Sequence, residues 1–167
     1  MFKRSRVLFM SWTSRVLGIA LRFVHTNIVV RDWERLAEFY VRVFGCTPVP
    51  PERCLSGRWL EKATAIPGAK IRGMHLRLPG HDDEGPTLEI FQYDVAGEAS
   101  NRSVNSPGFA HIAFYVDDVE AVRDAILEAG GSAVGELVRT DIPSVGEIEF
   151  AYMRDPEGNV IEIQRIR

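Results

Sequence analysis

The chain contains one pattern twice, and this duplication constrains the fold more than any other feature. Equivalent residues lie 86 positions apart: Phe23, His25, Val30 and Asp32 in the first half, and Phe109, His111, Val116 and Asp118 in the second. Each half also ends in a strand-like segment with a central glutamate, Thr87-Leu-Glu89-Ile-Phe91 and Val160-Ile-Glu162-Ile-Gln164. Self-similarity of this kind indicates a repeated structural unit. The sequence therefore predicts two similar modules, each contributing one histidine and one glutamate.

The first half predicts the element order β-α-β-β-β. Residues 21–30 alternate and are rich in β-branched side chains, which is typical of a strand, and Asp32 is placed to cap a helix that ends at Gly45. The remaining elements are expected to be a weak strand at 46–49, a short helix near 58–66, and a hairpin of 70–78 and 86–93.

The second half predicts the same order in shorter form. Asp117 and Glu120 have the spacing of a capping box, and Gly130-Gly131 is expected to end the helix. Strands are expected near 133–139, at 147–153 and at 160–166. The first half is 13 residues longer between its helix and its last strand, and this excess is expected to shape one wall of a pocket. The predicted boundaries are an extension over 1–20, modules over 21–93 and 108–167, and a linker over 94–107.

Composition limits the classes of partner. With 167 residues, 46% of them hydrophobic, the chain can form one well-packed domain over 21–167. The net charge of −3 comes from interspersed charges without a basic stripe, so nucleic acid is not an expected partner. No segment reaches membrane length, and the basic residues 1–20 are expected to be a flexible extension, with Met10 as an alternative start. Cys46 and Cys54 form no C-x-x-C, which favours a reducing cytoplasm.

Strand alternation predicts where the repeated polar residues point. His25 shares a strand face with Phe23 and Asn27, His111 shares one with Phe109 and Tyr115, and the glutamates share theirs with Phe91 and Gln164. These six neighbours are expected to line the pocket. Inward-facing polar groups without partners would each cost roughly 2–7 kcal/mol, and a divalent cation would satisfy all of them. Two imidazoles and two carboxylates suit Zn, Ni, Co, Mn or Fe(II). The predicted ligands of one such ion are His25, Glu89, His111 and Glu162.

Other polar clusters favour structural interpretations. The segment from His81 to Glu84 lies between glycines and is expected to be a solvated hairpin turn. His75 lies in the middle of a strand and is expected to be a packed or surface residue. The sequence contains no G-x-G-x-x-G, G-x-x-x-x-G-K or G-x-S-x-G motif, so dinucleotide-binding, P-loop and hydrolase functions have no support.

Residues 21–167 resemble the vicinal oxygen chelate superfamily, which includes glyoxalase I, methylmalonyl-CoA epimerase, extradiol dioxygenases and bleomycin-resistance proteins. The segments that carry the resemblance are Gly108-Phe-Ala-His111-Ile-Ala-Phe-Tyr-Val-Asp-Asp118 and Asp155-Pro-Glu-Gly-Asn-Val-Ile-Glu162. The resemblance implies an α+β fold in which two tandem βαβββ modules form a curled mixed sheet around a metal-binding cup. It matches the family's ligand positions to His25, Glu89, His111 and Glu162, in the order found in glyoxalase I.

The resemblance implies an isomerase or lyase that acts on a small α-oxygenated carbonyl compound. The metal would stabilise an enolate or enediolate, and Glu162, or Glu89 in the pseudo-symmetric role, would move the proton. Glutathione-dependent glyoxalase I typically carries arginine and asparagine where this chain has Val29 and Tyr93, and the epimerase typically carries glutamine at Glu89 and histidine at Ala110. These departures weaken glutathione as the thiol carrier and separate the chain from its named relatives.

Two alternatives stay open at this level. An extradiol-type dioxygenase would use three protein ligands, and the fourth ligand, Glu89, argues against it. A metal-free binding protein of the bleomycin-resistance kind would lack the ligand residues, all four of which are present. Family members assemble the site either within one chain or across two, and a homodimer is expected by resemblance.

Overall fold

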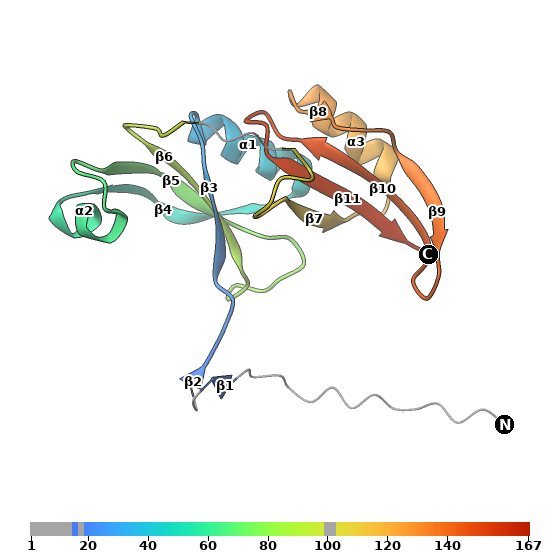
Figure 1. Ribbon diagram of the computed structural model, residues 1–167, viewed down its shortest axis with the longest axis horizontal. Coiled ribbons are helices and arrows are strands. Elements are labelled where there is room, and N and C mark those ends of the chain that lie inside the picture. Colours follow the sequence, from blue (N-terminus) through green and yellow to red (C-terminus); the bar gives the residue numbers. More distant parts are fainter. Residues whose placement is uncertain (1–14, 17–18, 99–102) are drawn as a thin grey trace.

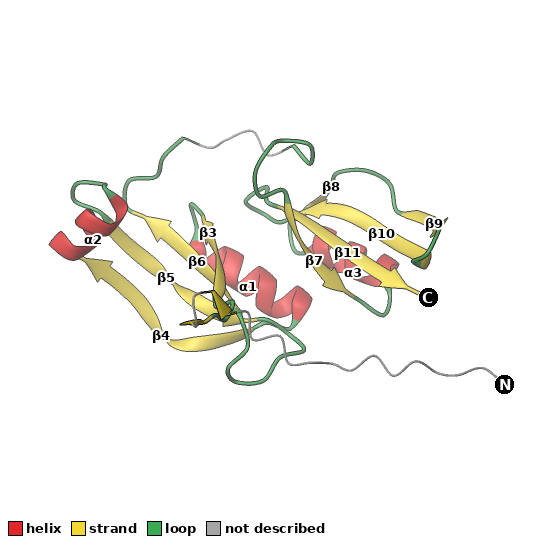
Figure 2. Cartoon of the chain, turned by 60° about the horizontal axis from the view of Figure 1, so that its bottom comes forward, coloured by secondary structure: helices red, strands yellow, loops and turns green. Residues whose placement is uncertain are grey.

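A computed structural model describes residues 15–16, 19–98 and 103–167. Within this part of the chain, two curled sheets each carry a helix against one face (Figures 1 and 2). Most of the predicted extension and residues 99–102 of the predicted linker lie outside the described residues. The short strands β1 (Arg15–Val16) and β2 (Ile19–Ala20) pair with each other ahead of the first module.

The first module has the predicted element order. Its elements are β3 (His25–Val29), α1 (Trp33–Phe44), β4 (Thr47–Ser56), α2 (Arg58–Thr64), β5 (Lys70–Arg77) and β6 (Thr87–Tyr93). The sheet order is β3-β6-β5-β4, with β3 parallel to β6 and the other pairs antiparallel.

The second module repeats this topology. Its elements are β7 (His111–Tyr115), α3 (Val119–Glu128), β8 (Ser132–Ala133), β9 (Val138–Ile142), β10 (Gly146–Arg154) and β11 (Val160–Ile166). The sheet order is β7-β11-β10-β8, and β9 also pairs with β10. Again the first strand is parallel to the last. The predicted α+β fold with two tandem βαβββ units is thus confirmed, with one curled mixed sheet in each unit.

Aspartate caps begin both principal helices. The Asp32 carboxylate accepts a hydrogen bond of 3.1 Å from the backbone N–H of Arg35, and Gly45 ends α1 in the left-handed conformation. The expected capping box at Asp117 and Glu120 is wrong, because Asp118 is the cap and accepts from the N–H of Ala121. Glu120 instead forms an ion pair with Arg139.

Strand β4 is much longer than the weak strand expected at 46–49. It pairs only with β5, so its outer edge makes no ladder bonds that the prolines would interrupt. The pairing register also shifts between Val49 and Arg53, where Pro50 and Pro51 lie. An edge position and an irregular register therefore accommodate a proline-rich strand.

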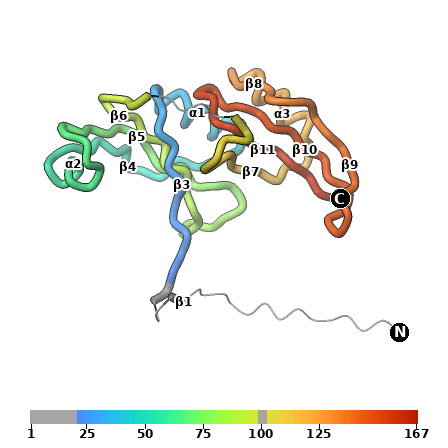
Figure 3. The backbone as a smooth tube through the Cα atoms, in the orientation of Figure 1, coloured from blue at the N-terminus to red at the C-terminus, as the bar shows by residue number. Residues whose placement is uncertain are grey.

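One hydrophobic core contains residues of both modules, although the two modules lie on different sides of the molecule (Figure 3). The rings of Phe44 in α1 and Phe114 in β7 stack with centroids 4.1 Å apart. Tyr40 in α1 is fully buried, and its hydroxyl donates a 3.1 Å hydrogen bond to Asp155 in the turn between β10 and β11. Helix α1 therefore fixes the second module against the first. No helix in the described part of the chain is both long and apolar enough to cross a membrane.

Candidate functional site

The predicted ligands lie on the face of each sheet opposite its helix, which we call the cup face. In the first module, Leu88 and Ile90 point into the core against α1, so Glu89 between them points to the cup face. Nε2 of His25 lies 3.4 Å from Oε2 of Glu89. This histidine and glutamate form the first half-site.

The first half-site contains a second histidine. His75 in β5 lies directly opposite Glu89 in the antiparallel pairing, and its Nε2 lies 3.1 Å from Oε1 of Glu89. The His25 and His75 rings are edge to face, with centroids 5.7 Å apart. Each carboxylate oxygen of Glu89 therefore has its own imidazole partner.

Neighbouring side chains orient this group. Thr87 Oγ1 lies 3.0 Å from Nδ1 of His75, and the Asn27 amide donates a 2.9 Å hydrogen bond to Oε2 of Glu89. Burial lowers the pKa of His75, the charges of Arg53 and His25 lower it further, and Glu89 opposes them. The neutral imidazole is the form that ligates metal ions.

The second half-site consists of His111 and Glu162. Nε2 of His111 lies 2.9 Å from Oε2 of Glu162. Tyr152 in β10 lies directly opposite Glu162, and its ring centroid is 5.2 Å from that of His111. Burial, assisted by the negative charge of Glu162, raises the pKa of Tyr152, so its hydroxyl stays protonated at neutral pH. Tyr152 occupies the position in the second module that His75 occupies in the first.

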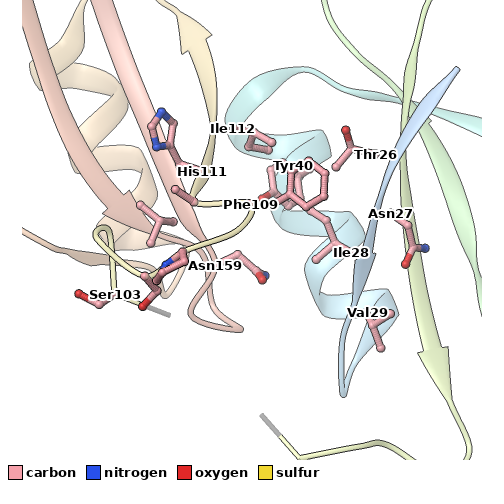
Figure 4. Close-up of a pocket in the computed structure, with 14 residues that line it drawn as sticks. Thr26, Asn27, Ile28, Val29, Tyr40, Ser103, Phe109, His111, Ile112 and Asn159 are labelled. Carbon is pink, nitrogen blue, oxygen red and sulfur yellow. The ribbon is translucent and has the colours of Figure 1, made fainter. Parts of the chain in front are cut away.

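The two half-sites are separate within one chain. Among the described residues, only His25, His75 and Glu89 form a group of three or more candidate ligands whose atoms all lie within 4.8 Å of one another. A cleft of about 420 Å³ lies between the modules and is lined by β3 residues and by Phe109 and His111. Figure 4 shows His111 and Asn27 on opposite sides of this cleft.

The residues predicted to line the pocket lie in different environments in the structure. Asn27 and Phe109 line the cleft between the modules, and Tyr115 lines a second cavity of about 400 Å³ beside it. Phe91 is buried, and its ring lies perpendicular to that of His75 with the centroids 5.9 Å apart. Phe23 is 66% exposed, and Gln164 lies in β11 beside Tyr115 of β7.

The sequence contained a signal for His75. The expected hairpin of 70–78 and 86–93 places His75 three residues before the end of its first strand and Glu89 three residues after the start of its second, so the two face each other across the pair. The segment from His81 to Glu84 is the exposed turn that was expected, with ion pairs from Arg77 to Asp83 and from Arg22 to Glu84.

Comparison with known proteins places these observations in a family. A model of the Glyoxalase/Bleomycin resistance protein/Dioxygenase superfamily matches residues 22–163. Two curated relatives, each described as a probable lactoylglutathione lyase, come from Vibrio parahaemolyticus (27% identity over 148 residues) and Vibrio cholerae (26% over 145). Both alignments cover 85% of this chain and 88% of the relative. A solved structure of a glyoxalase family protein from Bacillus cereus aligns with a TM-score of 0.76 at 19% identity, covering 90% of this chain and 97% of that one.

Proposed function

This chain belongs to the Glyoxalase/Bleomycin resistance protein/Dioxygenase superfamily, and we propose that within it the protein is a divalent-metal-dependent isomerase or lyase of the glyoxalase type. Its proposed substrate is a small α-oxygenated carbonyl compound. The observation that carries the proposal is the repeated pairing of a histidine with a glutamate on the cup face, His25 with Glu89 and His111 with Glu162.

The donor atoms fit a first-row divalent ion. Imidazole nitrogen and carboxylate oxygen are suitable ligands, and two carboxylates balance the charge of the ion. Ligand atoms on metal bonds of about 2.0–2.2 Å lie roughly 3–3.5 Å from one another. The nitrogen-to-oxygen distances in the half-sites, 3.4 Å and 2.9 Å, are of that size. The half-sites therefore need little rearrangement to hold an ion.

When bound, such an ion would polarise a substrate oxygen and stabilise the negative charge that develops when the neighbouring carbon loses its proton. We assign the proton transfer to Glu162, with Glu89 in the equivalent position of the other module. The side chain of Glu162 is only 14% exposed, which keeps bulk water from competing for the proton. His111 contacts its Oε2 and holds the carboxylate in place.

A second copy of the chain would complete the site. Strands β3 and β7 each lie at the edge of their sheet, and large apolar residues on or beside them are exposed: Phe23, Val24, Val29, Phe109 and Tyr115. In a homodimer, the first half-site of one copy would meet the second half-site of the other and cover these side chains. This arrangement would bring all four predicted ligands to one ion.

The relatives suggest the kind of substrate. An enzyme named lactoylglutathione lyase acts on a lactoyl thioester, which contains adjacent carbon-bound oxygens. Val29 and Tyr93 replace the residues that glutathione-dependent glyoxalase I typically carries, which argues against glutathione as the thiol carrier. The free cysteines Cys46 and Cys54 support a location in the cytoplasm.

The test combines metal content with activity. Untagged wild type, Glu89→Gln/Glu162→Gln and the exposed control Glu84→Gln would be analysed by plasma mass spectrometry. Each would then be assayed for thioester formation from methylglyoxal with glutathione or with a small thiol. We expect about one metal per chain in wild type and control, and loss of both metal and activity in the double variant. If the wild type binds no Zn, Ni, Co, Mn or Fe, the metalloenzyme proposal is wrong and a metal-free binding protein is the remaining interpretation.

A further inference from the structure

The two half-sites differ at one position. His75 lies opposite Glu89 in the first module, and Tyr152 lies opposite Glu162 in the second. We infer that His75 is a third metal ligand of the first module, and that His25, His75 and Glu89 hold the divalent ion there before the second half-site reaches it. This inference rests on the proposed function, since it concerns the same ion.

The three ligand atoms converge on one small volume. They come from three adjacent strands, β3, β6 and β5, and lie within 4.8 Å of one another. The edge-to-face arrangement of the two rings, at 80°, lets both Nε2 atoms point toward the Glu89 carboxylate without stacking. Two imidazoles and one carboxylate on one side of an ion leave its other positions open, as a catalytic site requires.

The surroundings of the three residues resemble the outer partners of metal ligands. A histidine that binds a metal through Nε2 usually makes a hydrogen bond through Nδ1, which fixes its tautomer and ring orientation. Thr87 provides this partner for His75 at 3.0 Å. The Asn27 amide donates a hydrogen bond to Glu89, and the ring of Phe91 lies perpendicular to that of His75. His75 is therefore held in one orientation before any ion binds.

The second module cannot form the same site. Tyr152 takes the place of His75 there, and among the described residues no third histidine, cysteine or carboxylate joins His111 and Glu162 within 4.8 Å, so the second module supplies two ligands. The first module would hold the ion, and the second would approach it from the open side. Glu162 would then bind the ion less strongly than Glu89, which agrees with the assignment of proton transfer to Glu162.

The test measures Co²⁺ affinity by calorimetry and bound cobalt by plasma mass spectrometry, on the purified full-length chain. The variants are His75→Phe, Thr87→Val and His111→Ala/Glu162→Gln, with His81→Ala as a matched histidine control in the exposed turn. We expect Thr87→Val to weaken binding by about 10–100-fold, as loss of an outer partner does, and His75→Phe to weaken it further. The His111→Ala/Glu162→Gln variant and the control should still bind about one ion per chain, with the double variant inactive.

The outcomes separate this inference from the proposed function. Wild-type affinity in His75→Phe, or loss of binding in His111→Ala/Glu162→Gln, would overturn the inference while leaving the metalloenzyme intact. A wild type without affinity for Co²⁺ or for other first-row divalent ions would overturn both. Circular dichroism and urea unfolding check that each variant is folded, and if His75→Phe is not, Thr87→Val and His75→Gln decide the question with smaller changes.

Discussion

The Tyr40 hydroxyl donates a hydrogen bond to Oδ2 of Asp155 across the junction between the modules. Tyr40 belongs to α1, and Asp155 begins the turn that connects β10 to β11. The carboxylate of Asp155 also accepts hydrogen bonds from the backbone N–H groups of Glu157 and Asn159 and from the Asn159 amide. One side chain of the first module thus closes a polar network in the second.

We expect Tyr40→Phe to lower the free energy of unfolding by about 1–2 kcal/mol, because a hydrogen bond to a charged group is lost while the ring stays in the core. Urea denaturation followed by circular dichroism and tryptophan fluorescence measures this change. Phe39→Leu, a change in the same core that breaks no hydrogen bond, is the control for altered packing. An unfolding free energy equal to that of wild type would show that the bond does not stabilise the junction.

The environment of Asp155 predicts that the free energy of unfolding depends on pH. Burial raises the pKa of Asp155 in the folded protein, and its hydrogen bonds only partly offset this effect. As pH rises, Asp155 therefore loses its proton in the unfolded chain before it does so in the folded protein. Its contribution to the free energy of unfolding is fully present below its ordinary pKa and disappears as pH rises through the raised pKa of the folded protein. The difference in unfolding free energy between wild type and Asp155→Asn should therefore become less favourable to wild type as pH rises from acid toward neutral. A difference that does not change with pH would contradict the raised pKa.

Gly73 lies two residues before His75 on the cup face of β5. Its φ is +154°, and a Cβ at this position would overlap the Ile90 carbonyl oxygen and lie 2.6 Å from Cδ1 of Phe91. We expect Gly73→Ala to destabilise the protein by about 1–3 kcal/mol and to weaken metal binding, because β5 must shift against β6. Gly80→Ala is the control, since Gly80 also has a positive φ but has open space around it. Equal unfolding free energies and metal affinities for the two variants would argue against a role for the close contact.

Mixing two inactive variants tests where the half-sites meet. If one copy supplies His25 and Glu89 while its partner supplies His111 and Glu162, a hybrid dimer of His25→Ala/Glu89→Gln and His111→Ala/Glu162→Gln has one intact site. Random exchange of subunits should then restore about a quarter of the wild-type activity. Sedimentation should show dimers for all three proteins. Absence of restored activity despite hybrid formation would place the site within one chain.

The sequence predicted the repeated parts of the structure better than the differing parts. Duplication singled out His25, Glu89, His111 and Glu162 as equivalent positions, and the structure places each histidine beside the glutamate of its own module. Asp32 was identified as a cap because local chemistry determines the start of a helix. His75 has no repeated counterpart of its own type, since Tyr152 stands at the equivalent position. Only the pairing register of β5 with β6 shows that His75 lies beside Glu89.

The longer β4 and the meeting of the half-sites depend on long-range structure. Pro48, Pro50 and Pro51 oppose strand formation locally, and only the edge position of β4 makes them acceptable. The separation of Glu89 from Glu162 within one chain depends on how α1 packs against both sheets, for example through Phe44 and Phe114. No short segment of the sequence encodes that packing.

Within the described residues, α2 has no counterpart between α3 and β11 of the second module. Leu60 of α2 packs with Ile71 and Phe91 on the first cup face and raises one wall there. A cup made from two identical halves would accept a ligand in either of two orientations related by half a turn. With one wall raised, the two orientations are no longer equivalent, and the glutamates of the two halves meet opposite ends of the ligand. An enzyme with such a cup would deliver a proton to one face of a prochiral carbon and release a single stereoisomer.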